Sequence, residues 1–155
     1  METNFLASIH SKVVHFPIAL LTTYSLLEII GVLFNKDFIS KSALLILCLG
    51  VFTAFLAVLT GNQASQAFNF WNNESTTLLI EHQNYATYLL WGTLAVCALR
   101  IYLTLKKKFS RRIKFIFILF AIAIVFLVYE TGIRGGNLVN KFGVGTDLRQ
   151  DPINK

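Results

Sequence analysis

Charged side chains are scarce in this sequence of 155 residues. Asp, Glu, Lys and Arg make up 14% of the chain and hydrophobic residues 55%, whereas soluble domains carry about 25% charged and about 45–50% apolar residues. This composition excludes an ordinary soluble protein, and the high apolar content excludes intrinsic disorder. The chain has only two cysteines, and Cys-x-x-Cys, Gly-x-Gly-x-x-Gly and phosphate-loop motifs are all missing.

The apolar residues gather in four long runs. These are Val13–Phe34, Ser42–Thr60, Tyr85–Leu105 and Ile113–Tyr129. Each has roughly 17–22 residues, the length that an α-helix needs to cross a bilayer. Because no strand-like alternation appears and hydrocarbon admits only helices or closed barrels, we predict a single all-α domain, an integral-membrane four-helix bundle. Its helices should cover residues 13–34, 42–60, 78–105 and 113–130, followed by a tail over 131–155.

The basic residues predict how the bundle is oriented. The chain has 14 Lys and Arg and a formal charge of +6. Nine of the 14 lie at or near the first and third connections: Lys36, Lys41, Arg100, Lys106, Lys107, Lys108, Arg111, Arg112 and Lys114. By the positive-inside rule these connections are cytoplasmic and both termini face outward. The charge therefore reflects topology rather than nucleic-acid binding, and we expect a multi-pass membrane protein whose termini both lie on the outer side.

All three histidines should then lie at one level near the outer surface. His10 precedes the first long apolar run, His15 lies at its start, and His82 precedes the third run. His15 already lies among apolar residues, where an ionisable side chain is expensive and needs a partner. Two imidazoles on two helices could ligate a haem iron. The hypothesis is one haem b between the first and third helices, with His15 and His82 as its ligands. His10 would either support one of these ligands or replace it.

The surroundings of these histidines suit a flat macrocycle. Small side chains follow His15 and His82 at helical spacing: Ala19 and Thr22 on the first helix and Ala86 on the third. Arg134 and Lys12 are candidate partners for the haem propionates. Such a protein would exchange electrons between the quinone pool and an outer-side protein.

Two other functions fit the same residues. His10, His15 and His82, with Glu81, could instead bind Zn²⁺ or copper. A non-redox structural or accessory subunit is also compatible with the sequence, as is a homo-oligomer.

Two further pairs of residues lie inside the predicted helices. Glu28 and Arg100 should lie at similar depth near the cytoplasmic side, so we expect an ion pair between neighbouring first and third helices. Cys48 and Cys97 fall in different apolar helices, and we expect buried, reduced thiols rather than a disulfide or a metal site.

Two stretches of the chain resemble a known bacterial family. The first is His10-Ser-Lys-Val-Val-His-Phe-Pro-Ile-Ala-Leu20, and the second is Thr131-Gly-Ile-Arg-Gly-Gly-Asn-Leu-Val139 followed by Phe142-Gly-Val-Gly145. They are similar to the opening and closing motifs of a predicted four-helix membrane protein family, domain of unknown function 2231. Two positions depart from its pattern: Ser11 replaces a proline, and Phe142 stands where the family tends to have histidine.

The resemblance to a bacterial family implies a multi-pass protein of the bacterial inner membrane with periplasmic termini, in a redox setting. Family members occur fused to, or beside, Rieske-type iron–sulfur and c-type cytochrome domains. It therefore implies that a c-type cytochrome or a Rieske protein on the outer side is the electron-transfer partner.

Overall fold

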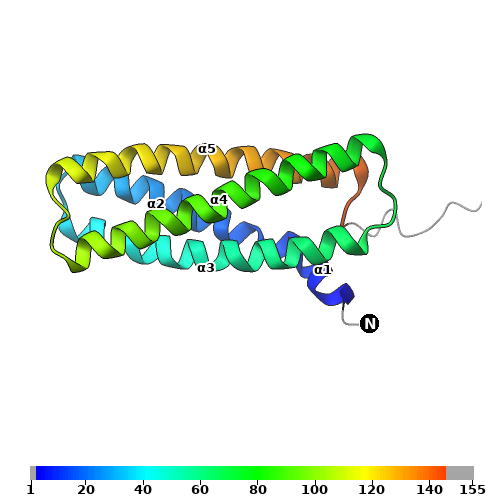
Figure 1. Cartoon of the computed structure of the whole chain (residues 1–155), viewed down its shortest axis with the longest axis horizontal. Helices are drawn as coiled ribbons and strands as arrows, with labels where there is room; N and C mark the ends of the chain where they lie inside the picture. The colour runs from blue at the N-terminus through cyan, green and yellow to red at the C-terminus, as the bar shows by residue number, and fades with distance from the viewer. Residues whose placement is uncertain (1–2, 146–155) are drawn as a thin grey trace, which may run out of the picture.

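The structure is a bundle of long helices. The computed structural model describes residues 3–145, and in that range helices joined by short loops are the regular secondary structure. The helices are α1 (Thr3–Val13), α2 (His15–Leu33), α3 (Asp37–Ala67), α4 (Asn73–Leu105) and α5 (Arg111–Phe142) (Figure 1). Four segments are long and apolar enough to cross a membrane: Phe5–Leu33, which joins α1 and α2, and the whole of α3, α4 and α5. The predicted all-α membrane bundle is confirmed.

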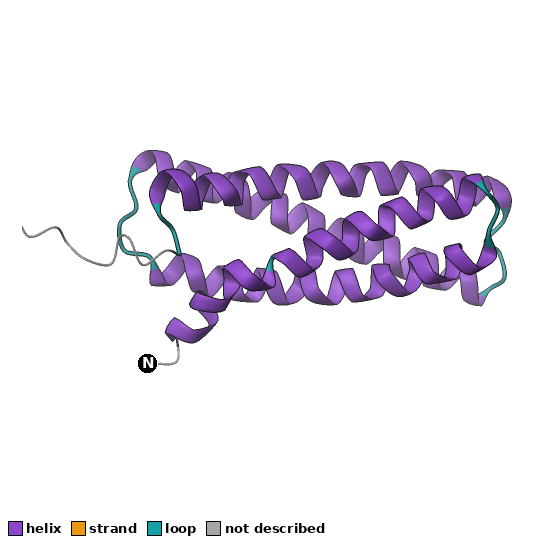
Figure 2. Ribbon diagram, turned by 180° about the vertical axis from the view of Figure 1, so that it is seen from behind, coloured by secondary structure: helices purple, strands orange, loops and turns teal. Residues whose placement is uncertain are grey.

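Helices α1 and α2 meet at Val14 and form one membrane span. The backbone N–H of Val14 donates to the His10 oxygen at 3.1 Å, and the N–H of Ile18 donates to the Val14 oxygen at 3.4 Å. Helical bonding therefore continues across the junction, although Pro17 has no N–H to donate to Val13. Helix α1 lies beside the C-terminal part of α3 (Figures 1 and 2).

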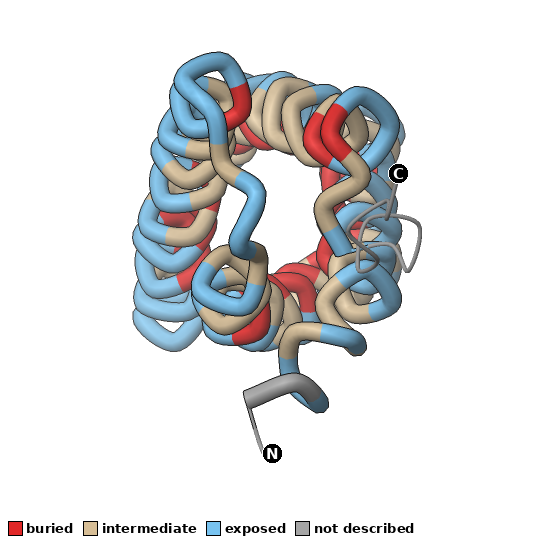
Figure 3. Tube along the Cα trace, turned by 90° about the vertical axis from the view of Figure 1, so that its right-hand side faces the viewer, coloured by how far each residue is buried: buried red, intermediate tan, exposed pale blue. Residues whose placement is uncertain are grey.

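The four spans alternate in direction around a common axis. Helix α2 packs on α3, α3 on α4, α4 on α5, and α5 on α2. Figure 3 looks along this axis at the end that carries the N-terminus. Among the described helices, α2 and α4 make no backbone contact and lie diagonally opposite each other. The expectation that the first and third spanning helices are neighbours is therefore wrong.

The helices extend beyond the apolar runs. Helix α3 covers 37–67 instead of the predicted 42–60, and α5 continues to Phe142 instead of ending near residue 130. Polar residues and glycines can continue a helix outside the hydrocarbon, so the loss of hydropathy does not mark the helix end. The first twelve residues of the predicted tail, 131–142, therefore belong to α5, and residues 146–155 lie outside the described residues.

The two halves of the bundle repeat one design. Five buried positions of α2 each match a buried position of α4 that lies 72 residues later in the sequence. This is the same separation as between Glu28 and Arg100. The matching pairs are Pro17 and Leu89, Leu21 and Thr93, Tyr24 and Val96, Ser25 and Cys97, and Glu28 and Arg100. The buried run Ala43, Leu47, Gly50 and Ala54 in α3 has the same spacing as Phe117, Ala121, Ile124 and Val128 in α5. The halves α1–α2–α3 and α4–α5 thus share one pattern of buried positions.

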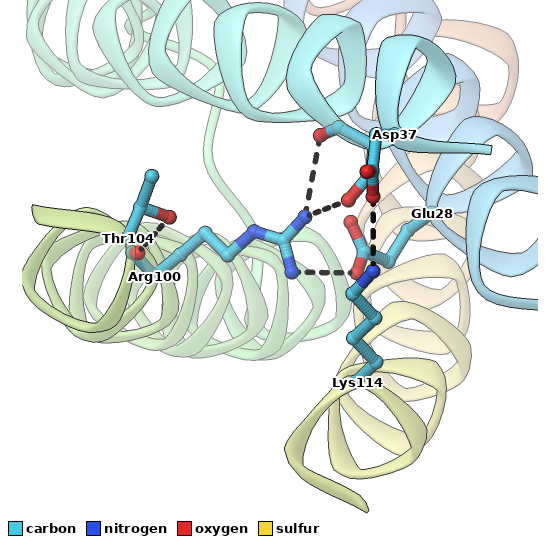
Figure 4. A network of polar contacts seen from close by, with 6 residues as sticks. Glu28, Asp37, Arg100, Thr104 and Lys114 are labelled. Atoms are coloured by element: carbon cyan, nitrogen blue, oxygen red, sulfur yellow. Dashed lines mark hydrogen bonds and ion pairs between the residues drawn. The ribbon is translucent and has the colours of Figure 1, made fainter. Parts of the chain in front are cut away.

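A charged pair lies inside the bundle, near the connections α2–α3 and α4–α5. The Arg100 Nη1 atom donates to Glu28 Oε1 at 2.9 Å, and Nη2 donates to Ser40 Oγ at 2.8 Å (Figure 4). Both side chains are buried, and the guanidinium carbon lies 3.5 Å from the centre of the Phe109 ring. The predicted ion pair is confirmed, and it bridges the bundle diagonal because the Arg100 side chain is long enough to cross the axis.

The two cysteines lie against each other in the core region. Their Sγ atoms are 3.6 Å apart, and both thiols are free. Cys48 belongs to α3 and Cys97 to α4, so this contact joins the two halves of the bundle.

Candidate functional site

Two histidines occupy the other end of the bundle, which we call the histidine end. Here α1 and the start of α4 meet the C-terminal parts of α3 and α5. His10 comes from α1 and His82 from α4, and they occupy equivalent positions in the two halves. They belong to helices that, over the described residues, make no backbone contact with each other, and each is held by a neighbouring helix at this end of the bundle.

The contacts of His10 determine which ring nitrogen carries its proton. Nδ1 of His10 lies 3.0 Å from the hydroxyl oxygen of Thr60. That hydroxyl donates its own hydrogen to the carbonyl oxygens of Leu56 and Ala57, at 3.0 and 3.1 Å. Since the hydroxyl hydrogen is engaged, Thr60 accepts from His10 and the proton resides on Nδ1. The Nε2 atom of the neutral ring therefore keeps its lone pair.

His82 has the same tautomer for a simpler reason. Its Nδ1 atom lies 3.1 Å from the backbone oxygen of Thr131 on α5. A carbonyl oxygen only accepts hydrogen bonds, so Nδ1 is the donor. Both histidines thus have Nδ1 bound to the protein and Nε2 available as a ligand atom, which is the arrangement that orients metal-binding imidazoles.

Each imidazole ring lies against a glycine of the facing helix. A Cβ atom added at Gly61 would lie 2.9 Å from His10 Cε1, and one at Gly135 would lie 3.0 Å from His82 Cε1. Both distances are shorter than an ordinary carbon–carbon contact of about 3.5–4.0 Å. The missing side chains at Gly61 and Gly135 therefore let the two rings approach the backbones of α3 and α5.

This site is limited to two strong ligands. Within residues 3–145, no group of three or more His, Cys, Asp or Glu side chains lies close enough to hold a metal ion. The arrangement offers two imidazole nitrogens, supported from α3 and α5, and no carboxylate or thiolate completes a coordination shell.

Comparison with known sequences gives the family. The profile described as "Predicted membrane protein (DUF2231)" matches residues 7–148, nearly the whole chain. The chain belongs to the DUF2231 family of predicted membrane proteins. The matched range contains both histidines, three whole spans, and all but the first two residues of the span Phe5–Leu33. Neither the curated proteins nor the solved structures include a match to this DUF2231 chain.

Four of the predicted site residues lie on the outside of the bundle. His15, Ala19 and Thr22 are exposed on one face of α2, and Thr22 lines an open apolar groove between α2 and α5. Lys12 on α1 is also exposed. The structure therefore places His10 and His82 at the same end of the bundle, held by α3 and α5, and leaves His15 on the outer face of α2.

The remaining predicted residues lie at the histidine end. Ala86 is half-buried one helical turn after His82. Arg134 donates to Glu81 at 3.2 Å and forms an ion pair with Glu130. Its guanidinium also lies 4.0 Å from the centre of the Tyr85 ring. Arg134 thus ties α5 to the start of α4.

Sequence reasoning did not identify the residues that position the two rings. These are Thr60 and Gly61 in α3, and Thr131 and Gly135 in α5. The sequence carries only a partial sign of them. A Thr-Gly pair occurs in each of these helices, at Thr60-Gly61 and Thr131-Gly132. In α5, however, the glycine that faces the ring is Gly135, and Thr131 acts through its backbone oxygen.

Proposed function

We propose that this protein is a b-type cytochrome-like electron-transfer module, with one haem b held by His10 and His82. The proposal rests on one observation: His10 and His82 lie at the same end of the bundle, and the protein holds each ring by its Nδ1 atom. With Nδ1 as donor, the lone pair of each Nε2 atom is the one that would bind a metal. In this proposal His10 takes the ligand role that the sequence suggested for His15, because His15 is exposed on the outer face of α2.

The number of ligands favours haem over a bare metal ion. Structural zinc is almost always bound by four protein ligands, and catalytic zinc keeps three. The described residues offer two here. A porphyrin supplies four nitrogens to iron, so two imidazoles complete the coordination. Bound haem would supply one-electron chemistry, and the protein's part is to hold and orient the two rings.

The residues around the pair would position the group and limit its motion. Thr60 and Thr131 hold the rings by their Nδ1 atoms, and Gly61 and Gly135 give the rings room. Lys12 is the freer candidate for the propionates, because Arg134 is already bound by Glu81 and Glu130. The positive charge of Arg134 would still raise the electrostatic potential at the site.

The setting that we propose is the bacterial inner membrane, with the histidine end on the periplasmic side. The basic connections at the opposite end support this orientation. Candidate redox partners are the quinone pool in the bilayer and a c-type cytochrome or Rieske protein outside it. Homo-oligomer formation is compatible with this arrangement. Labelling of single cysteines placed in the loops of intact cells tests the orientation.

The test of the function is a visible spectrum of the protein purified from haem-replete cells. We expect a Soret band and, after reduction, an α band. Both should be lost in His10→Ala and in His82→Ala and retained in His15→Ala, which removes a histidine of the same region. A colourless protein with stoichiometric zinc or copper would contradict the haem proposal in favour of a metal site. A colourless, metal-free protein would favour a structural or accessory subunit.

A further inference from the structure

A second site lies at the end of the bundle opposite the histidines. A pocket of about 400 Å³ opens between the start of α3, the end of α4 and the start of α5. Four cationic side chains line it: Lys41, Arg100, Lys107 and Lys114. We call it the basic pocket. Nothing in the proposed electron-transfer function requires such a site.

The charges of the basic pocket are not balanced by the protein. Asp37 is the carboxylate among its lining residues, and it is bound by Lys114 at 3.2 Å. Glu28 compensates Arg100 from inside the bundle (Figure 4). Lys41 and Lys107 have no ion pair within residues 3–145, so the pocket keeps a positive excess.

Two helix starts add to this positive character. Helix α3 begins at Asp37 and α5 at Arg111, and neither has a side-chain hydrogen bond capping its first turn. The first N–H groups of a helix are unpaired and carry the positive end of the helix dipole. Beside the lysines, they favour an anion at this end of the bundle.

The backbone holds Lys107 in an unfavourable conformation. Its φ angle is 53°, in the left-handed region. This position follows the end of α4, where glycine is preferred because other residues lose roughly 1–2 kcal/mol in that conformation. The equivalent position after α2 is Asn35, with a φ of 50°, and asparagine tolerates this region well. A lysine at this position has a conformational cost, and its ammonium group lines the basic pocket.

Arg100 supplies the deepest group of the site. It is 2% exposed, and its Nη atoms are taken by Glu28 and Ser40. Its Nε atom is buried and has no hydrogen-bond partner. A buried donor without a partner is costly, and the guanidinium adds its positive charge to the wall of the pocket.

We propose that the basic pocket binds one phosphate group, that of an anionic phospholipid headgroup. A phosphate matches the lysine ammonium groups and the unpaired helix N–H groups. The pocket lies at a helix end, next to the basic connections that the topology places at the cytoplasmic interface, where anionic headgroups reside. A soluble phosphate ester has the same chemistry and is the other source of such a group.

The test compares two variants that lose lysines from the same end of the bundle. Lys41→Gln with Lys107→Gly changes the pocket, and the glycine also relieves the left-handed backbone of residue 107. Lys106→Gln with Lys108→Gln removes two charges from the neighbouring loop without touching the pocket lining. Thermal unfolding without lipid checks that both variants fold. We expect the pocket variant to be at least as stable as the control.

Binding is measured by native mass spectrometry and thermal shift in detergent, with phosphatidylglycerol, phosphatidylcholine or inorganic phosphate added. We expect one phosphatidylglycerol per chain, and an affinity reduced on the order of tenfold or more in the pocket variant, since each lysine contributes about 1 kcal/mol. The loop control should lose clearly less. Equal stabilisation by inorganic phosphate would assign the site to a soluble phosphate. Equal losses in both variants, or no preference over phosphatidylcholine and no effect of phosphate, would overturn the proposal.

Discussion

Replacing Gly135 by alanine tests the histidine site without removing a ligand. The new Cβ atom would lie 3.0 Å from His82 Cε1 and 3.4 Å from its Nδ1 atom. Ordinary carbon–carbon contacts begin near 3.5 Å, so the ring has to retreat by about half an ångström. Metal–nitrogen distances tolerate about 0.2 Å. The shift therefore exceeds what a haem ligand accommodates.

The size of the effect follows from the loss of positioning. Moving the ring away from α5 also lengthens the 3.1 Å hydrogen bond from His82 to Thr131 toward the limit of such bonds. Loss of such a supporting bond typically lowers metal affinity about 10–100-fold. We therefore expect the haem content of Gly135→Ala to fall by about tenfold or more at limiting haem. The assay is haem per chain, from the pyridine haemochrome spectrum.

The neighbouring glycine provides a matched control. A Cβ atom at Gly136 would meet nothing within 4 Å. Gly136→Ala adds the same methyl group to α5 and gains about 1 kcal/mol of helix propensity, so it should bind haem like the wild type. Full haem occupancy in Gly135→Ala, or an equal loss in Gly136→Ala, would refute the reasoning.

Three further predictions concern other contacts. Glu28→Gln and Arg100→Gln should each lower the free energy of unfolding by about 3–5 kcal/mol, because each leaves the partner's charge buried; additive losses in the double variant would show that the pair does not interact. Thr60→Val removes the acceptor of the ring nitrogen Nδ1 and should lower haem affinity about 10–100-fold with little change in helix content, whereas unchanged titration curves would argue against the tautomer derived above. Mild oxidation with copper phenanthroline should join Cys48 to Cys97 within one chain, seen as a 2 Da mass loss that reductant reverses; a persistent pair of free thiols would contradict the packing of α3 on α4.

The fold could be predicted from the sequence because the membrane restricts the alternatives. Four apolar runs of sufficient length imply four spanning helices, whatever their side chains do in detail. The neighbours of each helix were not predictable in this way. The ion pair between Glu28 and Arg100 suggested adjacent helices, but an arginine side chain is long enough to join helices across the bundle diagonal.

The positions of the histidines could be predicted in part, and the missing part has a physical cause. Topology places the histidines near one end of the bundle, where His10 and His82 are found. The side of the first span that faces the bundle was not predictable for His15, because hydropathy is nearly uniform around α2. The contact of His10 with Thr60 shows that His10 faces α3. Neither orientation can be obtained from residue spacing alone.

The central claim is that two imidazoles, from His10 and His82, bind one haem iron. Electron paramagnetic resonance of the oxidised protein tests this claim most directly, because the spin state of ferric haem reports its axial ligands. We predict a low-spin signal from one haem per chain in the wild type and in His15→Ala. Replacement of His10 or His82 by alanine should abolish the signal or convert it to high spin. A low-spin signal that persists without His10 and disappears without His15 would contradict the account.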